Sequence, residues 1–502
     1  MFTRKMLFGI ALLLALAIGL GACAAPVPDA AKAISRSQIE SGQIVQAEQL
    51  RVAEYLQYYK QNFPQPVNTT LGLDLRLGNA QAPVEGGTAW LQVGIQAKSS
   101  AAEDIAPLNL ALVIDRSGSM DAPEKMPYLK QSLRVFLRSL ASNDIVAIVA
   151  FSDRAELLVP ATKVGDGSWI ENAINRLQPG GSTNLYDGLM MGFKEVDRNF
   201  DVRRNNCIIL LTDGLANVGT TDPNTIANAA RAYNDKGIYL SSIGLGKDFN
   251  DPLLSRLATQ GKGGYSYVDS AQEMDKVFRK EVSGLMQQAA SNVSVIITPA
   301  SGVSIDTLTG YDSRPPAGAL QVKLHDMGTG DSQVVLAKLN VSSSVSGRRS
   351  LATVELRYQD LFSKRNETMT QTVAVDASRL NNYDPTWDVE VLRNVTIQRT
   401  AEGLKEIDRL YKAQRYQDAW NLAYRLEQDL RMVARLTNEA QMVKDADLMR
   451  TYQDTLAKWV QQQTGRPPQY SDTGSGYSSD TGQPTRARQV LPTPSVPVIE
   501  IK

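Results

Sequence analysis

The sequence predicts an α/β fold in the middle of the chain, with β-strands on either side and helices after them. Short continuous apolar runs, the pattern of strands buried on both faces, alternate in the middle with amphipathic stretches of helical length. Elsewhere apolar and polar residues alternate singly, as in half-buried antiparallel strands. A chain of 502 residues is longer than a single hydrophobic core usually supports, so we expect several domains.

Four apolar runs and four amphipathic stretches define the α/β region, which we expect over residues 107–286. The alternation of strands and helices predicts a mostly parallel sheet covered by helices. The cluster GlyLysGlyGly at 261–264 lacks the spacing of a phosphate-binding loop and is interpreted as a turn. The expected strands are residues 108–114, 145–151, 207–211 and 238–244, and the expected helices are residues 125–140, 169–177, 185–200 and 224–235.

Alternating residues predict further strands before and after the α/β region. Two half-buried strands are expected within residues 67–106, and five or more within residues 290–378. The α/β domain is therefore either inserted in a β-sandwich or flanked by one. The alternation of apolar and polar residues shows which face of a strand is buried, but it does not show which strand pairs with it.

Helical patterns lie at both ends of this arrangement. We expect a helical segment over residues 38–66, ended by Pro64, and a helical region over residues 384–464. Residues 412–420 faintly resemble the turn of a TPR-type helix pair, but a single copy favours a plain helical bundle. Residues 465–502 are rich in Pro, Ser, Gly and Thr and are predicted to be disordered.

The N-terminus has the pattern of an export signal. Two basic residues precede an apolar stretch over residues 7–20, which ends in small residues. The following LeuGlyAlaCys resembles the lipobox of bacterial lipoproteins, which implies a signal peptide over residues 1–22, lipidation of Cys23 and a tether over residues 23–37. We therefore expect a lipid-anchored, extracytoplasmic protein at the cell membrane or outer membrane. The alternatives are an ordinary signal peptide with an incidental cysteine and an uncleaved membrane anchor.

Charge content argues against a nucleic-acid partner, and cysteine content argues against a disulfide within the chain. The 53 basic and 53 acidic residues give a formal net charge of zero, without the basic footprint of nucleic-acid-binding proteins, so we expect no nucleic-acid partner. Apart from Cys23 the chain has only Cys207, so no intramolecular disulfide is expected. The apolar neighbours of Cys207 predict a small residue inside a buried strand.

Polar side chains follow the predicted strands at the edge where ligands bind in such sheets. Asp115, Ser117 and Ser119 follow the first apolar run, Asp213 follows the third, and Thr183 lies in a GlyGlySerThrAsn loop before a helix. Two carboxylates and three hydroxyls, without His or thiol, are hard oxygen ligands that suit Mg²⁺, and also Mn²⁺ or Ca²⁺. The alternative is a strand-to-helix turn in which a serine caps the helix.

The order of these motifs identifies a resemblance. Residues 108–280, with AspArgSerGlySer at 115–119 followed by Thr183 and Asp213, resemble a von Willebrand factor type A (VWA) domain with its metal-ion-dependent adhesion site. The resemblance implies a Rossmann-like sheet, hydroxyls that contact the metal, and carboxylates that contact it directly or through water. An Asp or Glu of a protein partner would complete the metal's coordination. Asp187 either contacts a metal ligand without contacting the metal itself, or is a favourable negative charge at the N-terminus of a helix.

The sequence favours a binding protein over an enzyme. A single His325 in the β region cannot form a Ser-His-Asp relay near Ser117, and there is no His-Glu-x-x-His motif. We expect a membrane-anchored binding or adhesion module that captures a protein partner by metal coordination. The first alternative is a structural scaffold of an envelope complex, in which the metal only stabilises the fold. The second is a Mg-dependent hydrolase with Ser-Lys or two-carboxylate chemistry.

Overall fold

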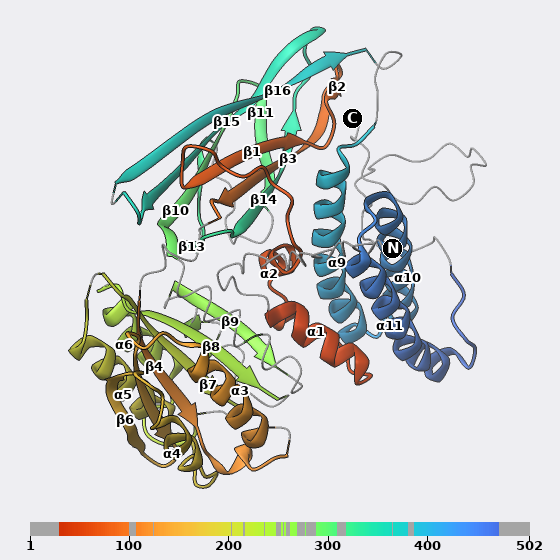
Figure 1. The fold of residues 1–502 in the computed structure, drawn as a ribbon. Helices are drawn as coiled ribbons and strands as arrows, with labels where there is room; N and C mark the ends of the chain where they lie inside the picture. Colours follow the sequence, from red (N-terminus) through yellow and green to blue (C-terminus); the bar gives the residue numbers. More distant parts are fainter. Residues whose placement is uncertain are drawn as a thin grey trace, which may run out of the picture.

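The computed structural model contains an α/β domain, a β domain of two sheets and a C-terminal group of helices (Figure 1). Cys23, the expected signal peptide and residues 471–502 of the expected tail lie outside the described residues. Within the described part of the chain, no helix is both long and apolar enough to cross a bilayer. The structure describes residues 30–99, 107–246, 253–257, 262–268, 277, 288–308, 318–379 and 386–470, except for residues 124, 202, 214–215, 235, 255 and 364.

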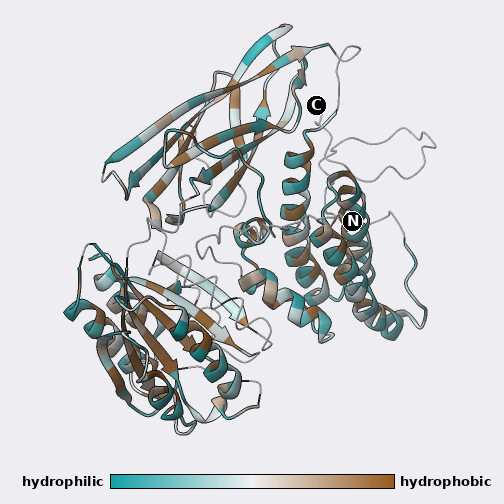
Figure 2. Ribbon diagram, viewed as in Figure 1, coloured by the Kyte–Doolittle hydropathy of each residue, from teal (hydrophilic) through white to brown (hydrophobic). Residues whose placement is uncertain are grey.

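The α/β domain is built on a six-stranded sheet with the order β6-β5-β4-β7-β8-β9. All neighbouring strands are parallel except β6, which runs antiparallel to β5 at one edge. Hydrophobic residues run along the central strands (Figure 2), as expected for strands covered on both faces. The Rossmann-like α/β fold is confirmed. Its elements are β4 (Leu108–Asp115), α3 (Met126–Ser139), β5 (Ile145–Phe151), β6 (Ala155–Lys163), α4 (Ile170–Asn175), α5 (Leu185–Arg198), β7 (Asn205–Thr212), α6 (Pro223–Asn234), β8 (Tyr239–Leu245) and β9 (Lys262–Val268).

Strand β4 is fixed between two apolar layers. Leu110 and Leu112 belong to the layer formed with α3 and α4, whereas Ala111 and Val113 belong to the layer formed with α5 and α6. Helix α5 approaches β4 closely at Gly192, where a Cβ atom would lie 2.4 Å from Val113 Cγ2. Close packing on both faces therefore holds the end of β4 in a defined position.

The two edge strands of this sheet were not predicted. Strand β9 begins at Lys262, so the interpretation of residues 261–264 as a turn was wrong. Gly264 is buried, and its N–H donates to Ser241 Oγ of β8 at 2.9 Å. Glycine in the interior of a strand has no side chain to pack. Its low strand propensity concealed β9 in the sequence.

Strands from before and after the α/β domain share the same two sheets. One sheet has the order β1-β3-β14-β11, and the other has the order β12-β10-β15-β16-β2, with β13 paired to β10. Leu91 of β3 lies opposite Ala337 of β14, and apolar side chains of both sheets form one core. The α/β domain is therefore an insertion between β3 and β10. The strands are β1 (Leu71–Leu77), β2 (Gln81–Pro83), β3 (Gly87–Ala97), β10 (Gln288–Pro299), β11 (Val303–Leu308), β12 (Leu320–Lys323), β13 (Met327–Gly328), β14 (Ser332–Val341), β15 (Gly347–Asp360) and β16 (Asn366–Ser378).

Three long helices follow the β domain, namely α9 (Val389–Lys412), α10 (Tyr416–Thr437) and α11 (Ala440–Thr464). Helix α10 packs against both of the others. Their apolar faces share a core with the N-terminal helices and with Trp90 and Leu336 of the β domain. This arrangement is a plain bundle rather than a series of stacked repeats.

The predictions for the N-terminal segment need correction. The chain does not form one helix over residues 38–66. Gly42, in the turn after the first helix, has φ of 72°, a left-handed conformation that commonly ends helices. Residues 30–37, expected to belong to the tether, are helical and mostly buried. The elements are α1 (Ala30–Glu40), a 3-10 turn η1 (Ala47–Gln49) and α2 (Val52–Tyr58).

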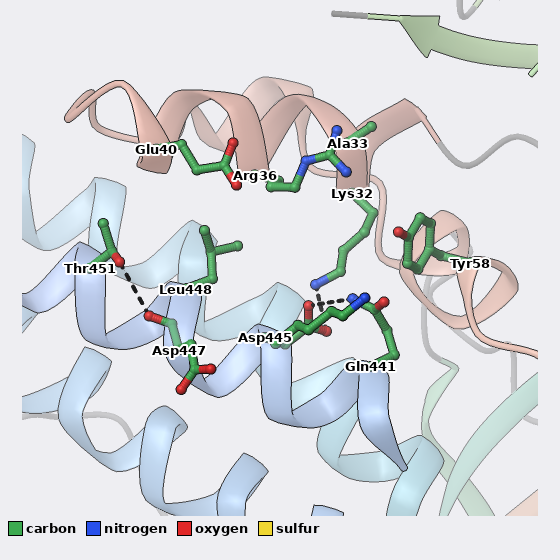
Figure 3. Close-up of a pocket in the computed structure, with 11 residues that line it drawn as sticks. Lys32, Ala33, Arg36, Glu40, Tyr58, Gln441, Asp445, Asp447, Leu448 and Thr451 are labelled. Atoms are coloured by element: carbon green, nitrogen blue, oxygen red, sulfur yellow. Dashed lines mark hydrogen bonds and ion pairs between the residues drawn. The ribbon is translucent and has the colours of Figure 1, made fainter. Parts of the chain in front are cut away.

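Helix α1 connects the α/β domain with the helical bundle. Ile34 belongs to an apolar layer of the α/β domain, and Ile39 belongs to the core of the bundle. Lys32 Nζ lies 2.7 Å from Asp445 Oδ2 of α11, and these side chains are only 6% and 5% exposed (Figure 3). The Tyr59 hydroxyl also donates to Asp445. Burial lowers the pKa of Lys32 and raises the pKa of Asp445, so both charged forms depend on their pairing.

We expect Asp445→Ala to loosen α1, because it leaves the Lys32 ammonium buried without its partner at a cost of about 3–5 kcal/mol. Amide hydrogen exchange of residues 30–40 should accelerate about 100-fold or more, since each 1.4 kcal/mol is a factor of ten. Asp447→Ala is the matched control, because that side chain is 64% exposed and pairs with Arg431 at the surface. Equal exchange in the two variants would contradict a stabilising role for the buried pair.

Candidate metal-binding site

The candidate site lies at the carboxyl ends of β4 and β7, which are neighbours in the centre of the sheet. The chain continues from β4 to β5 on one side and from β7 to β8 on the other. The two loops therefore leave in opposite directions and open a crevice at the sheet edge, the usual place for a ligand in such folds. Asp115 ends β4, and Asp213 directly follows β7.

Asp115 is completely buried, and both of its carboxylate oxygens have partners. Oδ1 accepts a hydrogen bond from the Ser117 backbone N–H at 2.8 Å, and Oδ2 accepts one from the Thr212 hydroxyl at 2.6 Å. Burial raises the pKa of Asp115 to about 6 despite these hydrogen bonds, and the charge of Asp213 adds to the increase. One carboxyl group thus ties the loop after β4 to the end of β7.

Ser117, Ser119 and Asp213 form a continuous chain of contacts. The two serine hydroxyl oxygens are 3.0 Å apart, and the Ser119 hydroxyl donates to Asp213 Oδ1 at 2.8 Å. Ser117 and Asp213 are each 2% exposed, whereas Ser119 is exposed. The polar group is therefore buried at its base and accessible at Ser119.

Thr183 comes from the third loop, which precedes α5. The Gly118 N–H donates to the Gly181 carbonyl at 2.9 Å, so this loop lies directly against the loop after β4. The Thr183 N–H donates to Asn217 Oδ1 at 2.8 Å. The Thr183 hydroxyl makes no hydrogen bond to any described residue. The loop that carries Thr183 thus lies against the loop that carries Ser117 and Ser119.

Asp187 lies at the start of α5 and interacts with the residue that caps this helix. Asn184 Oδ1 accepts a hydrogen bond from the Asp187 N–H at 3.3 Å, and Asn184 Nδ2 donates to Asp187 Oδ2 at 2.8 Å. A carboxylate in the first turn also complements the helix dipole. The sequence left two interpretations of Asp187 open, and these contacts favour its role as a charge at the N-terminus of α5 over a role in supporting a metal ligand.

Sequence reasoning missed Lys125 and Thr212. Lys125 Nζ lies 2.6 Å from Asp213 Oδ2 and 3.2 Å from the Ser119 carbonyl oxygen. A lysine in a loop before a helix carries no motif, so no sequence signal distinguished it. Thr212 directly precedes Asp213 at the end of a buried strand, and that position was the available signal for a role at the site.

The donor atoms fit a hard divalent cation. Carboxylate and hydroxyl oxygens are suitable ligands, and Asp213 already attracts a positive charge in the form of Lys125. Across the ranges that the structure describes, no three residues of the types His, Cys, Asp and Glu gather as a metal cluster. A cation here would therefore depend on the hydroxyls of Ser117, Ser119 and Thr183 as well as on the two carboxylates.

Gly181→Ala tests the contact between the loops. Gly181 has φ of 84°, and a Cβ atom there would lie 2.5 Å from Asp153 Oδ2, whose carboxylate is held by the Ser182 N–H. Gly180→Ala is the matched control, because Gly180 also has positive φ but nothing lies within 4 Å of its Cβ position. Overpacking costs about 1–3 kcal/mol, so Gly181→Ala should melt several degrees below Gly180→Ala. Identical melting temperatures would argue against close packing of this loop.

Comparison with known proteins supports the fold of this domain. A family model described as the von Willebrand factor type A domain matches residues 110–216. A solved structure described as von Willebrand factor type A from Catenulispora acidiphila has a TM-score of 0.51 and 18% identity, covering 75% of this chain and 91% of that one. At this level of identity the similarity is evidence for the fold alone.

Similar chains occur in bacteria and in mammals. The uncharacterized protein YfbK of Escherichia coli K12 is 30% identical over 269 residues, which cover 52% of this chain and 47% of that protein. An uncharacterized protein of Synechocystis is 25% identical over 316 residues, which cover 61% of this chain and 74% of that protein. Mouse inter alpha-trypsin inhibitor, heavy chain 4, is 28% identical over 220 residues, or 41% of this chain and 23% of that protein. The chain thus spans about half the length of YfbK.

Proposed function

We propose that this chain is a binding protein that captures a partner protein through a divalent cation held by a VWA domain, the family whose model matches residues 110–216. Domains of this family typically mediate protein–protein interaction. The observation that supports the proposal is the contact between Ser117, Ser119 and Asp213, together with the backbone hydrogen bond that holds the loop of Thr183 against the loop after β4. The proposed metal ligands are Asp115, Ser117, Ser119, Thr183 and Asp213.

Their contacts suggest different roles for the five residues. We assign direct contact to the hydroxyls of Ser117, Ser119 and Thr183. Both oxygens of Asp115 already accept hydrogen bonds, which favours an indirect role through Ser117 or through a water molecule. A bound Mg²⁺, Mn²⁺ or Ca²⁺ would supply a coordination position for an Asp or Glu of the partner. Ser119, as the exposed member, marks where that carboxylate would enter.

Binding explains these contacts better than hydrolysis. His325 lies between β12 and β13 of the β domain, where burial lowers its pKa, and not in the α/β domain. Lys125 directs its ammonium group to the Asp213 carboxylate and not to a serine hydroxyl. Neither a Ser-His nor a Ser-Lys pair is therefore formed by these residues, and a serine hydroxyl without a base is a weak nucleophile.

We further propose that lipidation of Cys23 holds the chain on the outer face of a membrane. The motif LeuGlyAlaCys after an apolar stretch supports this assignment. Six residues, 24–29, separate Cys23 from α1. Fully extended, they span about 20 Å at most. Helix α1, and with it the junction of the α/β domain and the bundle, would therefore lie close to the lipid.

Metal binding is tested with Asp115→Asn. The substitution preserves shape but replaces a carboxylate oxygen that positions either Ser117 or Thr212, so Mn²⁺ affinity measured by titration calorimetry should fall about 10–100-fold. Asp197→Asn is the matched control, since Asp197 lies near the opposite end of α5 and pairs with Lys236 at the surface. Equal affinities of the two variants would refute the assignment of Asp115.

Capture of a partner is tested by crosslinking in the native envelope. Chelation should abolish the crosslinked product and Asp115→Asn should strongly reduce it, because the first removes the cation and the second weakens its binding. Asp197→Asn should retain the product. Capture that survives both treatments would contradict metal-dependent binding. Unfolding on chelation, followed by circular dichroism, would instead favour the scaffold alternative, in which the metal only stabilises the fold.

A further inference from the structure

Lys125 supplies a positive charge at the candidate metal site. Its Nζ lies 2.6 Å from Asp213 Oδ2 and 3.2 Å from the Ser119 carbonyl oxygen, and the Asp213 side chain has no exposed surface. The other oxygen of Asp213 accepts the hydrogen bond from the Ser119 hydroxyl. The ammonium group thus engages two residues that also belong to the proposed ligand set.

Packing holds Lys125 in this position. Its backbone N–H donates to the Ala122 carbonyl at 3.0 Å, just before α3 begins. Its aliphatic chain passes over Gly246, which follows β8 and has φ of 75°. A Cβ atom at Gly246 would lie 2.9 Å from Lys125 Cε, so the absence of a side chain provides the space. The position of the Lys125 ammonium group is therefore set by contacts with the turn before α3 and with the residue after β8.

The charges of the site explain what this lysine does. Asp115 and Asp213 are both buried, at 0% and 2% exposure. A buried carboxylate without a nearby positive charge or hydrogen bonds is costly. The Lys125 ammonium offsets the charge of Asp213 directly, and its side chain is 16% exposed, which gives it a route to solvent.

We propose that Lys125 is an internal counter-cation that competes with the divalent cation for Asp213. This inference rests on the proposed metal-binding function. An ammonium group and a divalent cation repel each other when both contact one carboxylate, so binding of the ion displaces Lys125 toward solvent. The side chain has a flexible four-carbon stem that allows this movement. The lysine thereby sets the divalent-ion concentration at which the site can accept a partner's carboxylate.

Lys125→Met in the full-length chain tests the competition, because it keeps most of the stem and removes the charge. We expect Mn²⁺, measured by titration calorimetry after treatment with EDTA, to bind about tenfold more tightly than to the wild type. In EDTA the variant should melt at a lower temperature than the wild type, since Asp213 loses its counter-charge. Saturating Mn²⁺ should remove or reverse this difference.

Lys130→Met is the control for removal of a nearby lysine charge, because Lys130 lies within α3 and has no ion pair with a described residue. It should leave Mn²⁺ affinity within about twofold of the wild type. Lys125→Gln serves if Lys125→Met does not fold. Mn²⁺ affinity that is unchanged or weaker in the folded Lys125 variant would overturn the competition and leave the metal site standing. Failure of the wild type and of both Lys125 variants to bind Mn²⁺ would overturn the proposed function as well.

Discussion

Burial of the Asp115 carboxyl group is the constraint on which the candidate site depends. A charged group without access to water must find hydrogen-bond donors within the protein. Here the donors are the Ser117 backbone N–H and the Thr212 hydroxyl, so one side chain joins the loop after β4 to the end of β7. The same loop contacts Gly181 through the Gly118 N–H. The buried carboxyl group thus fixes the loop after β4, and that loop in turn holds the loop before α5.

The α/β sheet gives this constraint its rigidity. Every residue of β4 is buried, and its side chains alternate between two apolar layers that are covered by different helices. Neither layer can shift without disturbing close packing on its side of the sheet. Functional groups on loops are positioned best when such a scaffold fixes the loop ends. Flexible loops would instead lose conformational entropy each time they formed the site, which would weaken binding.

Much of this arrangement could be predicted from sequence, and the gaps have physical reasons. Continuous apolar runs revealed β4, β5, β7 and β8, because burial on both faces leaves few polar positions. Strand β9 was missed because it begins LysGlyGly, and glycine has low strand propensity and no hydrophobic signature. Residues 30–37 of α1 were assigned to a tether because the segment before residue 37 is rich in Ala and Pro, while the burial of α1 depends on distant partners such as Asp445. Lys125 reaches the site through tertiary packing alone.

The position of the α/β domain within the β domain also affects how the chain folds during synthesis. Strand β3 pairs with β1 and β14, and its partner in β14 lies far along the chain, with Leu91 opposite Ala337. Until β14 is made, β3 exposes an edge of unpaired backbone groups, and such edges promote aggregation. The α/β domain consists of contiguous residues and can complete its sheet during that interval. The first part of the β domain to emerge is therefore among the last to be completed, and it needs protection for longer than the domain inserted within it.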